Sequence, residues 1–320
     1  MGDYRRFPTT GPSHHRLERY AQRLQRRLYS SYFPCTATFG VSAALRIFLY
    51  SARLLRLRVS HILPLLAARL DGNIRVVAGA LPEERVAWPW AYQRWQTITF
   101  LHWAYDPADV QRLLPAELEV HTHDGLAWVG LTPFLLTDFH PPGLPAVPGL
   151  STFPETNLRT YVVDRTGLDG LWFLSLDADE LATVLGARAL LQVPYHWAAM
   201  SVDAGATVTY RSRRRWPPAV GHDIVVEPGS PLAAEELTER DHFLTGRWRA
   251  FTKIAGQLVS VPVEHQPWPL WSVRIDQVNQ DLLTVAGLPA PDGELLALYS
   301  PGVNVRFGPP RWLGSRRGDK

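Results

Sequence analysis

Apolar and polar residues alternate with a period of two along much of the chain that follows Trp88. The stretch "WQTITFLHWA" (95–104) is rich in β-branched and aromatic residues, which is typical of a β-strand. Comparable stretches recur as "PYHWAAMSVD", "ATVTYRS", "HDIVVEP", "GQLVSVPVEH", "LWSVRIDQV" and "GVNVRFG". The pattern predicts a domain built mainly from short strands.

Turn and capping signals divide these strands. Asp124-Gly125 within "ELEVHTHDGLAWVGLTPFLLTDF" predicts a hairpin, and "ETNLRTYVVDRTGLDGLWFLSLD" predicts a second one. "DPADVQRLLP" predicts a short helix capped by Asp106, "DADELATVLGARALL" a helix capped by Asp177 or Asp179, and "SPLAAEELTERDHFL" a third helix. Because βαβ alternation is not regular, the expected fold class is α+β, an antiparallel sheet or barrel with a few peripheral helices.

One predicted strand carries a polar face. The period of two in "PETNLRTYV" places Glu155, Asn157, Arg159 and Tyr161 on the same side, directly after the long Pro/Gly loop "HPPGLPAVPGLSTFP". This side is either the solvent-exposed face of a sheet or the lining of a polar cavity. In a cavity, the Arg159 guanidinium can bind a substrate carboxylate through two hydrogen bonds.

Composition narrows the class of protein. With 46% hydrophobic and 20% charged residues among 320, the chain has the composition of a globular protein. The single cysteine, Cys35, excludes an intramolecular disulfide and a CxxC motif, and no apolar run is long enough for a membrane-spanning helix. The nucleophile elbow GxSxG, the P-loop, GxGxxG and HExxH are all absent, so the most easily recognised enzyme classes are excluded.

The positive charge is concentrated at the N-terminus. Residues 1–85 hold 14 arginines and five acidic residues, whereas the rest of the chain has an acidic balance. The basic cluster "YRSRRRWPP" (210–218) is interpreted as a solvated loop, and no nucleic-acid partner is expected. "EVHTHDG" offers His121 and His123 at a spacing that suits a metal, but a solvent-facing strand accounts for the same pattern. The sequence predicts no metal and no cofactor.

Residues 1–85 are predicted to be a separate N-terminal extension, followed by a domain over 86–312 and a basic tail over 313–320. Within the N-terminal extension, the segment 41–70 is apolar but interrupted by arginines, and it has three interpretations. It is a basic amphipathic helix that contacts an anionic membrane, an organellar transit peptide, or a helical or poorly ordered extension or over-long gene start. The last is favoured, and no functional residue is assigned to the extension.

The order of several motifs along the chain carries more information than any one of them. "FLHWAYDP", "GLPAVPGLSTFPETNLRTYV", "SLDADELATVLGAR" and "VPYHWA" follow one another between Trp88 and Trp312. This succession resembles the acetoacetate decarboxylase-like superfamily and, within it, the uncharacterised YqjF-type family of bacterial proteins. The resemblance implies an antiparallel β-barrel or cone with a small-molecule pocket inside. The resemblance is compatible with a homo-oligomer, and the single cysteine fits a protein of the reducing cytoplasm.

The same resemblance implies an altered reactive centre. In the decarboxylase, the Schiff-base lysine follows a proline and stands beside a second lysine that lowers its pKa. Here Pro194 matches the proline, Tyr195 and His196 stand at the two lysine positions, and Glu155 matches the pocket glutamate. Neither Tyr nor His can form a Schiff base. Lys253 is well away in sequence, so imine chemistry is not expected.

Two function classes remain open. The first is an enzyme of lyase or isomerase type that uses acid–base groups on a small carbonyl or carboxylate compound. The second is a non-catalytic protein that binds a small ligand. A hydrogen bond between Glu155 and Tyr195 would favour the enzyme, and a wholly apolar cup would favour binding. The candidate catalytic residues are Glu155, Tyr195 and His196, and the candidate substrate-binding residues are Arg159, Asn157, Tyr161 and His102.

Overall fold

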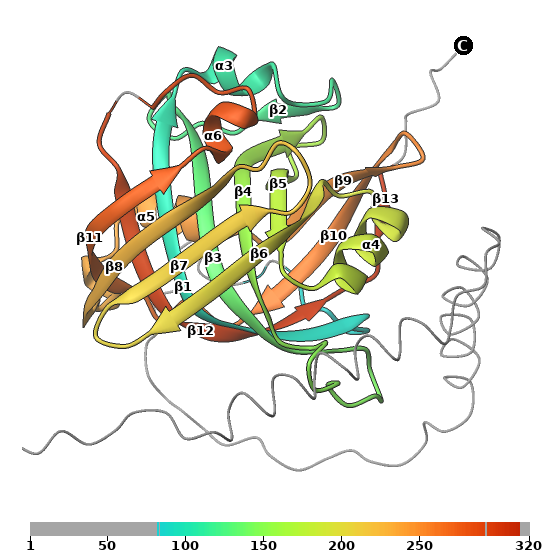
Figure 1. Ribbon diagram of the computed structural model, residues 1–320. Coiled ribbons are helices and arrows are strands. Elements are labelled where there is room, and N and C mark those ends of the chain that lie inside the picture. The colour runs from blue at the N-terminus through green and yellow to red at the C-terminus, as the bar shows by residue number, and fades with distance from the viewer. Residues whose placement is uncertain (1–81, 83, 292, 314–320) are drawn as a thin grey trace, which may run out of the picture. The chain divides into compact units, whose positions relative to one another are not determined.

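The computed structural model describes residues 82, 84–291 and 293–313 (Figure 1). The three interpretations of segment 41–70 therefore concern residues outside the described part of the chain. Within the described part, no helix has the length and apolar character needed to cross a membrane.

The described residues form 13 strands and a few short helices. The strands are β1 (Ala91–Tyr105), β2 (Leu118–Val120), β3 (Ala127–His140), β4 (Phe153–Asp164), β5 (Asp169–Ala178), β6 (Tyr195–Ala204), β7 (Val208–Arg214), β8 (Gly221–Pro231), β9 (Arg249–Ile254), β10 (Gln257–His265), β11 (Trp271–Gln280), β12 (Leu296–Phe307) and β13 (Arg311–Trp312). The helices are α3 (Pro107–Gln111), α4 (Leu181–Leu190), the 3-10 turn η1 (Ala234–Glu236), α5 (Glu239–Thr245) and α6 (Leu282–Val285).

Strand pairing closes two rings that share a wall. One ring runs β10-β9-β5-β4-β3-β1-β12 and returns to β10, and the other runs β5-β6-β7-β8-β11-β12-β1-β3-β4 and returns to β5. Strands β12, β1, β3, β4 and β5 belong to both rings (Figure 1). The barrel-like α+β fold predicted from the sequence is thus confirmed, and the shared wall lies between two interiors.

The expected all-antiparallel pairing is wrong at two places. β5 runs parallel to β6 and parallel to β9. The first pair arises because the segment that contains α4 turns the chain back to the last residues of β5, so that β6 begins beside Leu176–Ala178 and runs in the same direction. The sheet therefore contains one βαβ unit, β5-α4-β6, that the sequence pattern did not indicate.

The predicted hairpin around Asp124-Gly125 is also wrong as a strand pairing. Both residues take positive φ, as a tight turn requires, but only the isolated bridge His123–Leu126 flanks them. β2 pairs with β4 instead of β3. This pairing buries the Leu118 side chain, which is 1% exposed, in a cluster with Val162, Phe251 and Leu258. The second predicted hairpin, β4 with β5, is confirmed.

The N-cap of α4 is Glu180, whose carboxylate accepts from the backbone N–H groups of Ala182 and Thr183. The predicted caps are engaged elsewhere. Asp177 is 0% exposed and pairs with Arg214, with Nε and Nη2 each 2.9 Å from Oδ1. Asp179 pairs with Arg215 at 3.2 Å. Much of the basic cluster thus lies on β7 and is bound to acids.

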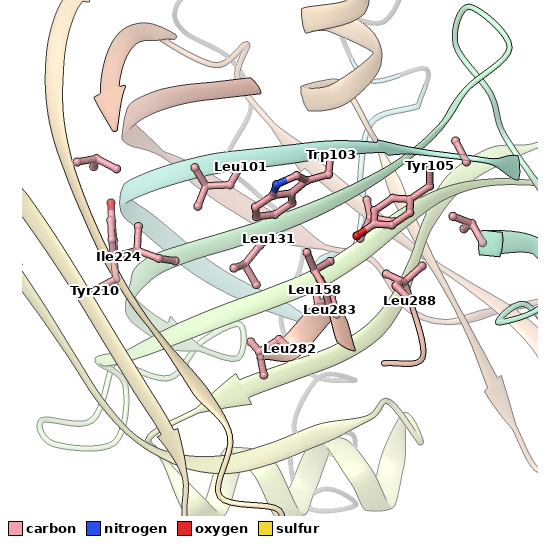
Figure 2. Close-up of a cluster of buried hydrophobic side chains, with 14 of the residues drawn as sticks. Leu101, Trp103, Tyr105, Leu131, Leu158, Tyr210, Ile224, Leu282, Leu283 and Leu288 are labelled. Atoms are coloured by element: carbon pink, nitrogen blue, oxygen red, sulfur yellow. The ribbon is translucent and has the colours of Figure 1, made fainter. Parts of the chain in front are cut away.

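A large apolar cluster lies on the β7–β8 side of the shared wall (Figure 2). Leu101, Leu131 and Leu158 come from β1, β3 and β4, and they face Tyr210 and Ile224 from β7 and β8. Residues of α6 complete the cluster. Full burial of each aliphatic side chain contributes about 1.5–3 kcal/mol, so this cluster is a principal source of stability for the shared wall.

The Asp177–Arg214 pair supplies a stability test. Arg214→Met should leave the Asp177 carboxylate buried without a partner and lower the free energy of unfolding by about 3–5 kcal/mol. Urea denaturation at pH 7 measures this change. Arg211→Met is the control, because Arg211 is exposed and pairs with Asp203 at 3.4 Å, so its loss should cost less than about 1 kcal/mol. Equal effects of the two substitutions would contradict the role assigned to the pair.

Candidate functional site

The polar face of β4 lies inside the protein. Glu155 is 4% exposed, Asn157 and Arg159 are each 6% exposed, and Tyr161 is 0% exposed. The interpretation as a solvent-exposed face is therefore wrong. The alternate residues point into the other interior, since Thr156 hydrogen-bonds to His222 on β8 at 2.8 Å and Leu158 joins the apolar cluster. β4 is buried on both sides because it belongs to the shared wall.

Glu155 and Tyr195 form a direct contact. Tyr195 begins β6 and lies beside Leu176 of β5, which places its ring against the polar face of β4. The Tyr195 hydroxyl donates to Glu155 Oε2 at 3.0 Å. The ring packs on an apolar cluster that includes Phe134, Phe153 and Val184. A carboxyl group and a phenol thus meet in low-dielectric surroundings.

This environment keeps both groups protonated. Burial raises the pKa of Glu155 from 4.5 to about 8, and the hydrogen bond from Tyr195 opposes only part of that rise. Burial, together with the nearby Glu155, raises the pKa of Tyr195 well above 10. At neutral pH, Glu155 is mostly a neutral acid and Tyr195 a neutral hydrogen-bond donor.

A second group of polar residues lies farther along β4. His102 Nε2 is 2.7 Å from the Tyr161 hydroxyl, and that hydroxyl donates to the Leu244 carbonyl at 2.6 Å. Because the phenol has one proton, His102 must donate through Nε2–H. Gly130 makes this contact possible, since a Cβ there would lie 2.9 Å from His102 Nε2.

Arg159 belongs to this second group. Its guanidinium carbon lies 5.5 Å from the centre of the Phe100 ring. Burial, and then the charge of Arg159, lower the pKa of His102 well below 6.5, so the imidazole is neutral. Arg159 and Glu155 are four residues apart on β4, about 13 Å along the strand. The structure therefore divides the candidate residues into an acidic pair and a cationic group.

His196 is not brought to Glu155. It follows Tyr195 on β6, so its side chain points to the opposite side of the strand. Burial, then Arg214 and Arg188, lower the pKa of His196 to about 4. Its backbone register partner on β5 is Asp177. His196 thus lies beside the buried ion pair and away from the Glu155 carboxyl.

Sequence reasoning missed Arg247, which follows α5 and is 8% exposed. Its guanidinium carbon is 5.1 Å from the centre of the Tyr161 ring and 4.3 Å from that of Phe243. The only sequence signal was the pair of arginines around a tryptophan in "GRWRAF", which has no periodic pattern. The residue is found through its contact with Tyr161.

A cavity of about 880 Å³ lies elsewhere, between the ends of β1, β3, β10 and β12. Tyr92, His140 and Arg94 are among its lining residues, and the long Pro/Gly loop contributes Ala146. Neither Glu155 nor Tyr195 lines it. Its inner wall includes His265, whose ring lies 4.6 Å from those of Trp248 and Trp268. We place the candidate site by burial and hydrogen bonding at β4, because this cavity lacks the acidic pair.

The histidines considered for a metal pack on an aromatic ring instead. His121 and His123 lie 5.0 and 5.2 Å from the Phe243 ring, measured between ring centres. Among the residues that the structure describes, no three His, Cys, Asp or Glu side chains gather in a way that could hold a metal ion.

Comparison with known proteins matches residues 92–304 to the family DUF2071, described as an uncharacterized conserved protein. The chain belongs to this family. Uncharacterized protein YqjF of Bacillus subtilis (strain 168) is 34% identical over 220 residues, which are 68% of this chain and 90% of that protein.

Solved structures support the fold. An acetoacetate decarboxylase-like enzyme from Sphingomonas wittichii RW1 has a TM-score of 0.51 at 17% identity, covering 72% of this chain and 96% of its own. Acetoacetate decarboxylase from Legionella pneumophila has a TM-score of 0.50 at 14% identity, covering 80% of this chain and 100% of its own. The YqjF-type family and the decarboxylase-like fold predicted from the sequence are thus confirmed.

The raised pKa of Glu155 predicts a pH-dependent stability. The folded protein holds this proton up to about pH 8, whereas the unfolded chain releases it near pH 4.5. The stabilisation that comes from the raised pKa of Glu155 is therefore complete below about pH 4.5 and is lost as the pH rises through about 8. Glu155→Gln should gain stability relative to wild type by a few kcal/mol between pH 5 and pH 9, since each pKa unit is worth about 1.4 kcal/mol.

Urea midpoints measured across this range for wild type, Glu155→Gln and Glu119→Gln check the prediction. Glu119 lies on β2 and is exposed. Its variant should follow wild type at every pH. Parallel curves for Glu155→Gln and wild type would show that the Glu155 carboxyl titrates normally.

Proposed function

We propose that this protein catalyses proton transfer at a carbon next to the carbonyl of a small molecule, with Glu155 and Tyr195 as its acid–base groups. The observation that carries the proposal is the 3.0 Å hydrogen bond between these groups, with the Glu155 carboxyl 4% exposed. The reaction class is that of a lyase or isomerase without a covalent intermediate. Enolisation, hydration and cyclisation belong to this class.

The two groups have complementary roles. Tyr195, which stays protonated, donates a hydrogen bond to the substrate carbonyl oxygen and stabilises the negative charge that develops there. Glu155, with a pKa of about 8, is partly ionised near neutral pH. A group whose pKa lies close to the working pH accepts and returns a proton efficiently. Glu155 therefore takes the proton from carbon and delivers it to the product.

A Schiff base is not part of the proposal, because it requires a primary amine. Tyr195 and His196 have none. Lys253 lies on β9 and donates to both carboxylate oxygens of Glu117, at distances of 2.9 and 3.2 Å. Lys320, the other lysine of the chain, lies outside the described residues.

The cationic group is proposed to bind the other end of the substrate. Arg159 supplies the positive charge, and Asn157, Tyr161 and His102 supply hydrogen-bonding groups nearby. Asn157 Oδ1 is buried without a hydrogen-bond partner in the described structure, so it can accept from a hydroxyl or N–H group of the ligand, while Arg159 donates to the anionic group. A substrate that reaches both groups is elongated, with its carbonyl at Tyr195 and an anionic group at Arg159.

Binding without catalysis is the second candidate function. The observation that favours it is the aromatic wall formed by Trp95, Trp268 and Phe100, in which the Trp95 and Trp268 rings are stacked with their centres 6.1 Å apart. Such a wall suits apolar contact with a ketone or a hydrophobic acid. In that case, the protonated Glu155–Tyr195 pair orients the ligand.

Deuterium exchange separates these candidates. A panel of 2-oxo acids, 3-oxo acids and ketones is incubated with the protein in D₂O. Wild-type protein should introduce deuterium at the carbon next to the carbonyl of some of these compounds, and the loss of the corresponding ¹H NMR signal measures the rate. Glu155→Gln should lower the exchange rate by about 10²–10⁴-fold because it removes the general base. Tyr195→Phe should lower it because the donor to the developing oxyanion is lost. Glu119→Gln should exchange at the wild-type rate.

Borohydride reduction with mass spectrometry runs beside this assay. No reduced adduct is expected, and an adduct on Lys253 would overturn the lysine-free mechanism. If a panel member raises the melting temperature of wild type and Glu155→Gln equally and no exchange occurs, the protein binds without catalysis.

A further inference from the structure

One whole edge of the Arg247 guanidinium has no hydrogen-bond partner among the described residues. Its Nη1 donates to the Gly246 carbonyl at 3.2 Å and lies 3.5 Å from Asp169. Nε and Nη2 are buried and make no hydrogen bond in the described structure. These two N–H groups share the side of the guanidinium that donates two parallel hydrogen bonds to a carboxylate or phosphate. Arg247 thus presents a buried, unused anion-binding edge.

Arg159 is the second buried cation at this place. It is 6% exposed, makes no ion pair within the described part of the chain, and its Nε also lacks a hydrogen-bond partner. The Tyr161 phenol connects it to Arg247. Burial raises the pKa of Tyr161, while the charges of Arg159 and Arg247 act on the same phenol in the opposite direction. The two guanidinium groups therefore lie around one tyrosine.

In the described part of the chain, Asp169 is the one acid that pairs with either of these two cations, and it is shared with Arg249. Asp169 lies 3.5 Å from Arg247 but 2.9 Å from Arg249, which takes the closer contact. His102 and His121 are neighbours whose pKa values are lowered, mainly by burial, so they add no charge at neutral pH. Water can satisfy an N–H group, but it does not neutralise a charge in a low-dielectric interior.

We infer that Arg159 and Arg247 together bind a small dianion, a dicarboxylate or a phosphate monoester, with one anionic group on the free edge of Arg247. A monoanion would leave one of the two guanidinium charges uncompensated. The inference deepens the proposed function. It rests on that function for one point, which is that Arg159 binds one end of the substrate. It narrows the substrate to a carbonyl compound whose other end carries two negative charges.

Thermal unfolding of the full chain tests the charge of the ligand. At pH 7 and constant ionic strength, inorganic phosphate, succinate and 2-oxoglutarate are compared with acetate, pyruvate and chloride. The melting temperature should rise with the concentration of at least one dianion and stay nearly constant with the monoanions. A monoanion that stabilises the protein as much as every dianion would overturn the assignment, as would the absence of any response.

Variants test the residues. Arg247→Met and Arg159→Met should each lose the response to dianions, whereas Arg211→Met on β7 should keep it. Arg247→Lys retains the charge but not the two-donor edge, so isothermal titration should show dianion affinity weakened by about tenfold or more. This variant keeps the test decisive if Arg247→Met does not fold. Equal responses in Arg247→Lys and wild type would exclude the edge-on contact.

One further variant separates this inference from the proposed catalysis. Glu155→Gln should bind the dianion with wild-type affinity, because Glu155 lies about 13 Å from Arg159 along β4. Dianion binding without any deuterium exchange would leave the anion site standing and remove the catalytic proposal. Deuterium exchange without dianion selectivity would leave the catalytic proposal standing and remove the anion site.

Discussion

Burial of β4 on both sides is the constraint on which the rest of the structure depends. In a sheet with one solvated face, the polar residues of β4 would need no partners. Because two rings share this strand, Glu155, Arg159 and Tyr161 lie where each charge or hydrogen bond has to be balanced within the protein or by a ligand. The neutral Glu155, the Tyr161–His102 hydrogen bond and the guanidinium N–H groups that have no hydrogen-bond partner among the described residues all reflect this single condition.

The sequence predicted much of the fold because local patterns are strong here. The strand predicted over 95–104 and the Asp106 cap of α3 depend on neighbouring residues, and both are found, although β1 is buried on both sides from Ile98 to Trp103. Strand pairing depends on contacts between distant residues, so the sequence misassigned β2. The burial of Leu118 next to β4 outweighs the turn signal of Asp124-Gly125. The cap of α4 was misassigned for a related reason, since Arg214 on β7 withdraws Asp177 from the helix.

The candidate site was predictable only in part. Alternation placed Glu155, Arg159 and Tyr161 on one side of a strand, and the resemblance placed Tyr195 near Glu155, but neither could show that this side is buried. Arg247 was out of reach because it lies in a turn after α5, where no periodicity indicates the direction of a side chain. Its importance comes from the Nε and Nη2 edge, which has no hydrogen-bond partner among the described residues, and pairing is a property of the folded chain.

The shared wall also bears on the order in which the protein folds. β12 pairs with β1, β10 and β11, so both rings close through a strand near the end of the chain. During synthesis, β1 emerges roughly two hundred residues before its partner β12, and contacts of such sequence separation form slowly. The nascent chain must therefore keep this edge of β1 unpaired until β12 has been synthesised. Assembly of the interior around Glu155 and Arg159 then waits for β12.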